Sequence, residues 1–229
     1  MAATAPAPVD KADWGELVVV RHGETAWSRT GRHTGRSDIP LTPAGVEQAR
    51  AQGEALAGRT FALTLVSPLQ RARHTAELLG HGDGEPEPDL MEWDYGPVEG
   101  LTRVQVIEAL GHPWAALGDG VRQPLTISGT DDLPPEQRNA HPGPGELVEE
   151  VAARAARVIA RAEPVLRSGG DVLFVAHGHV LRILTATWLE LHADVAERLE
   201  MGTAARSVLG YDRGARCLRH WNVPPGVKE

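Results

Sequence analysis

Two short apolar runs, each ending at a histidine followed by a glycine, constrain the fold of this chain most. The first run, "ELVVV" at 16–20, leads directly into "RHG". The second run, "DVLFVA" at 171–176, leads into "HGH". Short runs rich in β-branched residues are typical of buried parallel strands. Both runs therefore predict buried strands that end on polar groups, which are costly to bury without a function or a partner.

Helical signals alternate with these strands. Thr42 predicts an N-cap, with Pro43 in the first turn of a helix that ends at Gly58. Ser67 predicts the N-cap of a second helix, which Gly80 ends. A long amphipathic helix is expected over 147–162, with Leu147 on its apolar face, and another helix after 177. Further strands are expected near 61–66, 205–210 and 216–220. This alternation predicts an α/β fold, a three-layer sandwich whose mostly parallel central sheet carries helices on both faces.

The length of 229 residues fits one large domain, which we place at 15–224 after a disordered tail at 1–14 rich in alanine and proline. The segment 118–145 is rich in proline and glycine and too long for a plain connection, so it predicts a lid or insertion over a site.

Composition excludes several classes of protein. No run is long enough to span a membrane, and the N-terminus lacks the apolar core of a signal peptide, so we expect a cytoplasmic protein. Cys217 is the only cysteine, which excludes an intrachain disulfide and a cysteine-rich metal site. The net charge of -8 argues against a nucleic-acid partner or an anionic membrane surface.

The two His-Gly pairs are expected to meet at one edge of the sheet. In open α/β sheets, ligands bind beyond the carboxyl ends of the strands. The helix that follows Gly178 points N–H groups toward whatever lies beside His177, and Arg21 adds positive charge, so the edge suits an anion. Taken alone, either His-Gly pair fits a simple turn, and Arg21 fits a surface ion pair. The combination of all three favours an anion site.

Five stretches, taken together, resemble a known family. "LVVVRHGETAW" is similar to the defining motif of the histidine phosphatase superfamily, which is also called phosphoglycerate-mutase-like. The stretches "TGRSDIPLTPAGVEQA", "SPLQRARHTA", "LMEWDYGPVEGLT" and "VAHGH" resemble further family motifs, and they occur in the family's order over 16–222. In detail the chain looks most like the branch of small acid phosphatases and sedoheptulose-bisphosphatase-like sugar phosphatases.

The resemblance implies a catalytic role for five residues. His22 is the implied nucleophile, which becomes phosphorylated, and a neutral imidazole suits that task. Arg21 and Arg71 match the phosphate-binding arginines, whose planar guanidinium groups form paired hydrogen bonds to phosphate. His177 matches the second catalytic histidine. Glu92 matches the proton donor for the leaving group, a task that needs a carboxyl with a raised pKa.

The resemblance also implies a set of substrate contacts. Thr34 and Gly35 stand where the family contacts the substrate away from its reacting phosphate. Ser28 stands where the mutases have asparagine, and Gly178 and His179 adjoin the second histidine. Because the positive side chains supply the charge that Mg²⁺ supplies in kinases, we expect neither a metal nor another cofactor.

These features predict a phosphomonoesterase that hydrolyses a small phosphorylated metabolite, such as a sugar phosphate, through phosphohistidine. The stretch after "EGLT" offers only Arg103 and Arg122 and lacks the paired arginines of a mutase, which favours hydrolysis. A cofactor-dependent phosphoglycerate mutase and a non-catalytic phospholigand-binding or regulatory domain remain alternatives. A phosphoprotein substrate also stays open, and the resemblance suggests a homodimer. The family often has Gly-Glu-Ser before the long late helix, whereas this chain has Gly-Glu-Leu at 145–147.

Overall fold

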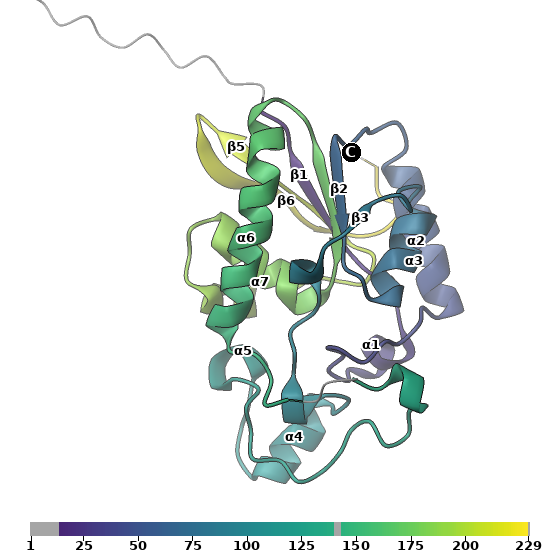
Figure 1. The fold of residues 1–229 in the computed structure, drawn as a ribbon, viewed down its shortest axis with the longest axis vertical. Helices are drawn as coiled ribbons and strands as arrows, with labels where there is room; N and C mark the ends of the chain where they lie inside the picture. Colours follow the sequence, from purple (N-terminus) through teal and green to yellow (C-terminus); the bar gives the residue numbers. More distant parts are fainter. Residues whose placement is uncertain (1–13, 140–142, 229) are drawn as a thin grey trace, which may run out of the picture.

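β1 (Leu17–Arg21) lies inside a six-stranded sheet of order β3-β2-β4-β1-β5-β6 in the computed structural model, which describes residues 14–139 and 143–228 (Figure 1). β1 pairs in parallel with β4 (Val172–Ala176), which pairs in parallel with β2 (Leu63–Val66). The sheet is therefore mostly parallel, as predicted. The remaining strands are β3 (Glu85–Pro86), parallel to β2, and the antiparallel β5 (Arg206–Asp212) and β6 (Ala215–Val223).

Helices cover both faces of the sheet. Alternate residues of each strand point to opposite faces, and apolar residues on both faces pack against helices. Leu17 and Val19 belong to a cluster with buried residues of α6 (Val148–Arg167) and α7 (Gly178–Trp188). Val18 and Val20 belong to a second cluster with α3 (Gln70–Leu78), and α2 (Pro43–Ala55) packs on α3. Figure 1 shows α6 and the pair α2 and α3 on opposite sides of the strands. The predicted three-layer α/β fold is confirmed.

The helix that follows β2 corrects one detail of the sequence analysis. α2 begins as predicted, with the Thr42 hydroxyl accepting the N–H of Gly45 at 3.1 Å. α3 begins only at Gln70, and its N-cap, Leu69, has no capping side chain. The prediction that Ser67 caps this helix is therefore wrong. The Ser67 side chain is directed to the site described below.

The start of α6 gives a second correction. Leu147 is the N-cap of α6 and is 44% exposed, so it does not share the buried face formed by Val151, Ala155, Val158, Ile159 and Ala162. A leucine side chain cannot accept the N–H groups at the helix start. The leucine in Gly-Glu-Leu therefore removes a helix cap.

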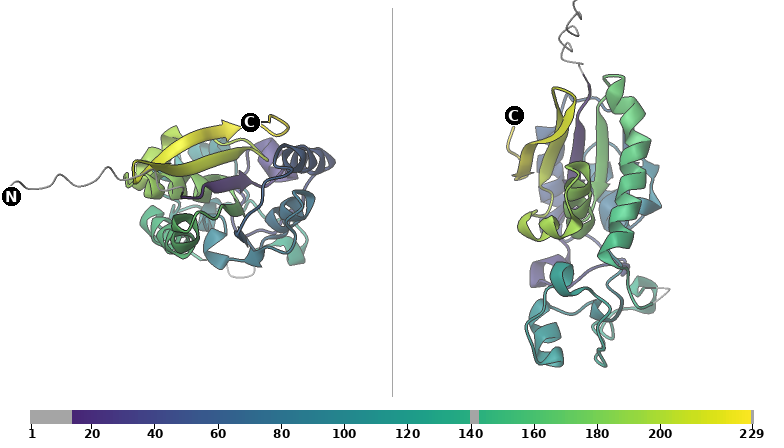
Figure 2. Two further views of the ribbon diagram at one scale, coloured as in Figure 1. Left: turned by 90° about the horizontal axis from the view of Figure 1, so that it is seen from above. Right: turned by 90° about the vertical axis from the view of Figure 1, so that its left-hand side faces the viewer.

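Short helices and loops form a cap at the carboxyl end of the parallel strands (Figures 1 and 2). The cap contains α1 (Ala26–Thr30), α4 (Arg103–Leu110) and α5 (Ala116–Asp119). The 3₁₀ turns η2 (Gly96–Val98) and η3 (Pro135–Gln137) lie before α4 and after α5. Two further turns are η1 (Pro88–Leu90), which packs against α6, and η4 (Ala193–Arg198), which follows α7. The cap and the sheet enclose the edge at which the two histidine motifs were expected.

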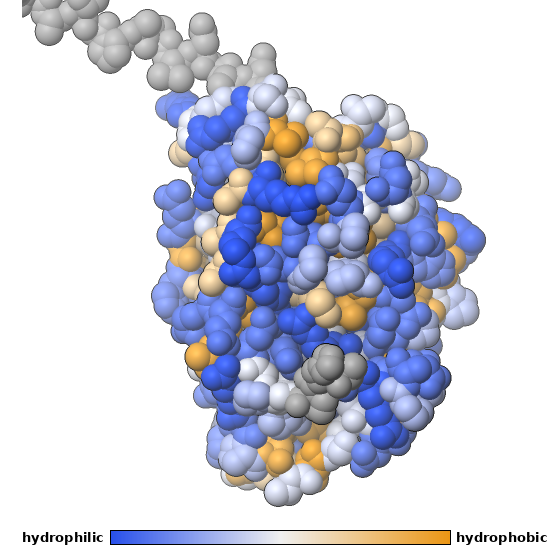
Figure 3. Space-filling view, viewed as in Figure 1, coloured by the Kyte–Doolittle hydropathy of each residue, from blue (hydrophilic) through white to orange (hydrophobic). Residues whose placement is uncertain are grey.

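The predicted tail lies outside the described residues except for Trp14. That ring packs edge-on against Tyr211 with centroids 4.6 Å apart, so Trp14, which the prediction assigned to the tail, packs on the folded chain. Within the described residues, no helix is both long enough and apolar enough to cross a membrane. On the face in Figure 3, apolar residues form small areas separated by hydrophilic ones.

The segment 118–145 contains only one end of α5 and the turn η3, and its residues 140–142 lie outside the described part. Asp132 of this segment forms an ion pair with Arg32, with a 3.0 Å distance between side-chain N and O. The backbone of Gln137 accepts the N–H of Asp38 at 2.9 Å. These contacts tie the segment to the loop that follows α1. Its action as a lid stays a prediction.

Candidate active site

The register of the sheet brings the two histidine motifs together. Arg21 at the end of β1 pairs with Ala176 at the end of β4, and the N–H of His22 donates to the Ala176 carbonyl at 2.9 Å. His22 and His177 are the next residues on the two strands. Their ring centroids lie 5.1 Å apart. The prediction that both motifs meet at one sheet edge is confirmed.

The His22 ring is held in one tautomer. Its Nδ1 lies 2.7 Å from the Gly23 carbonyl, which can only accept, so Nδ1 carries the proton and Nε2 keeps its lone pair. The Thr75 hydroxyl holds the same residue by accepting the N–H of Gly23 at 3.1 Å. Burial lowers the pKa of His22 well below its ordinary value, and the charges of Arg71 and Arg21 lower it further. His22 is therefore a neutral imidazole, the form that acts as a nucleophile.

Arg21 and His22 line one pocket beyond the end of β1. Arg21 Nη1 donates to the Met201 carbonyl at 2.5 Å, which fixes the side chain. Its Nε is buried and has no hydrogen-bond partner among the described residues. Burial lowers the pKa of Arg21, and the charge of Glu92 opposes that shift. Because Arg21 also lines the pocket, its positive charge can attract an anion there.

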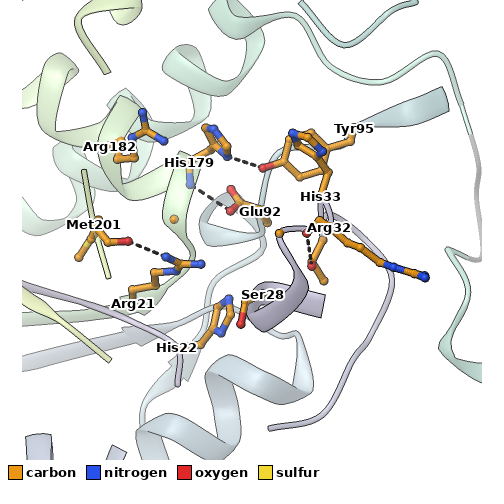
Figure 4. Close-up of a pocket in the computed structure, with 13 residues that line it drawn as sticks. Arg21, His22, Ser28, Arg32, His33, Glu92, Tyr95, His179, Arg182 and Met201 are labelled. Carbon is orange, nitrogen blue, oxygen red and sulfur yellow. Dashed lines mark hydrogen bonds between the residues drawn. The ribbon is translucent and has the colours of Figure 1, made fainter. Parts of the chain in front are cut away.

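Glu92 occupies the N-terminus of α7. Its Oε1 accepts the N–H of Val180 at 2.9 Å, and its Oε2 accepts the N–H of His179 at 3.0 Å. The sequence predicted that such N–H groups would suit an anion beside His177. For these two N–H groups the partner is a carboxyl of the protein itself, so they are not available to a ligand. The helix terminus instead fixes the position of Glu92, whose side chain lines the pocket (Figure 4).

His177 is fully buried between two polar partners. Arg71 Nε donates to its Nδ1 at 3.1 Å, so Nδ1 is unprotonated and Nε2 carries the hydrogen. The hydroxyl of Ser67 then accepts from Nε2 at 2.7 Å. Burial lowers the pKa of His177 well below its ordinary value, and Arg71 contributes next. His177 is thus neutral and fixed in orientation.

Arg71 donates hydrogen bonds to three carbonyl groups of the loop that follows α1. Its Nη1 donates to Ser37 O at 2.9 Å, and its Nη2 donates to Gly35 O at 2.8 Å and to Thr34 O at 3.1 Å. Together with the bond to His177, these contacts use four of its five N–H groups. The resemblance implied direct binding of phosphate, and this structure shows mainly bonds to the protein.

The pocket brings together most of the predicted site. It is lined by 13 residues, namely Arg21, His22, Ser28, Gly31, Arg32, His33, Thr34, Glu92, Tyr95, Gly178, His179, Arg182 and Met201. Figure 4 shows His22 and Arg21, at the end of β1, and Glu92, from the loop between η1 and η2, directed into it. Arg71, His177 and Gly35 do not line it, but Arg71 donates to the carbonyl of the lining residue Thr34, and the His177 ring lies next to that of His22. A cationic pocket beside a neutral histidine and a carboxyl suits transfer of a phosphoryl group.

Comparison with known proteins decides the family. Residues 17–224 match the model of the histidine phosphatase superfamily (branch 1). The chain belongs to this superfamily. It is 35% identical to an acid phosphatase of Mycobacterium tuberculosis, over 88% of this chain and 89% of that protein. It is 29% identical to a sedoheptulose 1,7-bisphosphatase of Saccharomyces cerevisiae, over 85% of this chain and 74% of that one.

Structural comparison agrees with this placement. The product of an open reading frame of Mycobacterium tuberculosis, solved at 2.2 Å, matches this histidine phosphatase with a TM-score of 0.78 and 33% identity, over 92% of this chain and 98% of that one. The relatives also include a 2,3-bisphosphoglycerate-dependent phosphoglycerate mutase of Cytophaga hutchinsonii, which is 31% identical over 82% of this chain and 84% of that protein.

Several residues of this histidine phosphatase site were missed by sequence reasoning. Ser67 lies in the quoted "SPLQRARHTA" motif, but its place before a proline suggested a helix cap. Tyr95 lies in "LMEWDYGPVEGLT", and its hydroxyl bonds to Nδ1 of His179. Burial raises the pKa of Tyr95 well above its ordinary value, with Glu92 adding to the rise, so Tyr95 keeps its proton and donates. Arg32 and Arg182 had no signal that separated them from surface arginines.

Among the described residues of this histidine phosphatase, no group of three or more histidine, cysteine, aspartate or glutamate side chains is placed to hold a metal ion. Independence from metals stays a prediction. The Gly-Glu-Leu departure also gains a physical meaning, since Leu147 is outside the pocket lining and acts at the start of α6. The departure therefore affects the start of the helix. The predicted substrate contacts lie elsewhere.

Proposed function

We propose that this histidine phosphatase is a phosphomonoesterase that hydrolyses small phosphorylated metabolites through a phosphohistidine at His22. The observation that carries the proposal is the neutral His22 ring. Its Nδ1 donates to the Gly23 carbonyl, which leaves the Nε2 lone pair for attack, and Arg21 lines the same pocket. The names of the relatives, an acid phosphatase and a sugar bisphosphatase, support a small phosphate ester as substrate.

The reaction proceeds in two steps. His22 Nε2 attacks phosphorus, the bond from phosphorus to the ester oxygen breaks, and Glu92 gives its proton to the departing oxygen. Water then attacks phosphorus with loss of a proton to Glu92, the P–N bond breaks, and inorganic phosphate leaves. Arg21 balances charge on the phosphoryl oxygens in both steps. Arg71 fixes the orientation of His177, whose ring lies next to that of His22, and no step calls for a metal ion.

Hydrolysis is favoured over mutase chemistry by the arginines after "EGLT". Arg103 Nε donates to the carbonyl of Trp114 at 2.9 Å, and Arg122 forms an ion pair with Glu150 at 2.9 Å. Neither of these arginines lines the pocket. Neither is therefore placed to hold a second anionic group of a phosphoglycerate during transfer, as a mutase would require.

The test is phosphate release from a panel of sugar phosphates and phosphoglycerates in the presence of EDTA. We expect release from at least one ester with the wild-type protein, none with His22→Ala, and full release with His74→Ala, which removes an exposed histidine of α3. Interconversion of phosphoglycerates with a bisphosphoglycerate primer, without release, would identify a mutase. A protein inert toward every ester would instead support a non-catalytic phospholigand-binding domain.

A further inference from the structure

Glu99 is a buried carboxylate outside the pocket, and the proposed mechanism does not use it. It follows η2 and is 6% exposed. Its Oε1 accepts the N–H of Gly35 at 3.0 Å and the N–H of Ser37 at 2.9 Å, and its Oε2 lies 3.1 Å from the same N–H of Gly35. One side chain thus fixes two peptide groups of the loop after α1.

Arg71 holds carbonyls of the same segment, including the carbonyl of the peptide group between Thr34 and Gly35 whose N–H donates to Glu99. The carbonyls of Thr34, Gly35 and Ser37 accept its guanidinium N–H groups at 2.8 to 3.1 Å. The segment 34–37 therefore lies between a carboxylate that accepts from its N–H groups and a guanidinium that donates to its carbonyls. The structure shows no hydrogen bond or ion pair between the side chains of Glu99 and Arg71, so the backbone of this segment is the hydrogen-bonded link between their positions.

We propose that Glu99 is a positioning residue that acts through segment 34–37 on Arg71, and through Arg71 on His177. The proposal rests on the proposed function, because it concerns the catalytic groups of that reaction. Thr34 lines the pocket, and Arg71 Nε holds His177 Nδ1 at 3.1 Å. A shift of Glu99 therefore moves both the pocket wall and the second histidine.

The packing around Gly35 shows how closely the carboxylate must approach. A Cβ at this position would lie 2.5 Å from Oε2 of Glu99 and 2.5 Å from the carbonyl oxygen of Trp93. Real Cβ atoms do not come so close, so only glycine lets the backbone reach Glu99. The length of the Glu99 side chain is therefore matched to the backbone it holds.

Charge and length can be separated at this position. Burial raises the pKa of Glu99 to about 7, against the N–H groups of Ser37 and Gly35 and the charge of Arg71. At pH 8 the group is ionised. Glu99→Gln then removes the charge but leaves an oxygen able to accept both N–H groups. Glu99→Asp keeps the charge but withdraws the oxygens by about 1.5 Å, the length of one C–C bond.

The experiment measures kcat and KM at pH 8 for both variants, with thermal unfolding, beside wild type, His22→Ala and Val106→Ala. Val106 is a fully buried core residue of α4 outside this hydrogen-bond path. We expect Glu99→Asp to lower kcat by about 10- to 100-fold, with a smaller change in KM, because small misplacements of catalytic groups are costly. Glu99→Gln should stay within about fivefold of wild type, because it preserves the accepting oxygen. Val106→Ala should lower the unfolding midpoint and leave kcat unchanged.

Two results overturn the inference. One is full activity of Glu99→Asp. The other is a higher kcat for Glu99→Asp than for Glu99→Gln. That result would mean that the position supplies buried charge rather than a side chain of the right length. Failure of the proposed function looks different, because then the wild-type protein releases no phosphate or His22→Ala retains activity.

Discussion

Arg71 Nε donates to Nδ1 of His177 at 3.1 Å, and this single bond sets the tautomer of the second histidine. Because Nδ1 accepts, Nε2 must carry the hydrogen, and it donates to Ser67 at 2.7 Å. The two residues come from α3 and from the end of β4, which are far apart in sequence. They meet because β2 and β4 are neighbours in the sheet.

Arg71→Lys should therefore disturb both catalysis and folding. A lysine ammonium cannot reproduce a planar group that donates to His177 and to three carbonyls. We expect kcat to fall about 100-fold through misplacement of His177, and stability to fall by about 2–4 kcal/mol through loss of buried charged hydrogen bonds. Steady-state kinetics and denaturant unfolding measure the two effects. Arg73→Lys, at an exposed position on the same helix, is the matched control and should change neither.

Ser67→Ala should weaken catalysis without disturbing the helix. It leaves Nε2–H of His177 without an acceptor, at a cost of about 1–3 kcal/mol. We expect kcat to fall about tenfold and the helical circular dichroism to stay unchanged, because Ser67 does not cap α3. Ser168→Ala, at an exposed serine after α6, should be neutral. A loss of helix content with normal kcat would restore the capping role.

The sequence was sufficient to predict the strands of the sheet other than the two-residue β3, and the meeting of the two histidines. Strand runs and His-Gly endings are local signals, and parallel strands place their carboxyl ends at one edge by topology alone. Partners of buried side chains carry no such signal. Whether Arg71 binds phosphate or carbonyls depends on the loop at 34–37, which approaches α3 only in the folded chain.

The helix N-terminus shows the same limit. The sequence predicted free N–H groups at the start of the helix after His177, and an anion is the expected partner of such groups. The anion in the structure is Glu92, from a loop more than 80 positions earlier. Ser67 was misjudged because Ser-Pro before a helix is a strong local capping signal, whereas its actual partner, His177, lies 110 positions away.

The acid limb in the plot of kcat/KM against pH should lie well below pH 6.5. Burial lowers the pKa of His22, and Arg71 and Arg21 lower it further, so the nucleophile stays neutral in mild acid. Protonation, which removes the lone pair, then occurs only at lower pH. Arg21→Gln removes one of these charges and should move the acid limb of kcat/KM to higher pH, by up to about one unit, besides lowering kcat/KM.

That shift is measured with one substrate for wild type, Arg21→Gln and the exposed control Arg73→Gln, so that ionisation of the substrate cancels. Arg73→Gln should leave the limb in place. An acid limb that stays fixed in Arg21→Gln would show that another group controls it.

Glu92→Gln should slow the release of poor leaving groups far more than that of good ones. The backbone N–H groups of His179 and Val180 hold the Glu92 carboxyl in place, and the amide keeps an oxygen for one of them, so the fold should be preserved. The amide cannot give a proton to the departing alkoxide. We expect kcat/KM for an alkyl phosphate to fall about 10²- to 10⁴-fold, in line with general acid catalysis, and for nitrophenyl phosphate by much less, because nitrophenolate leaves unprotonated. The comparison of the two esters within one variant is its own control. Equal losses on both would remove Glu92 from the role of leaving-group acid and would leave it as a group that fixes the start of α7.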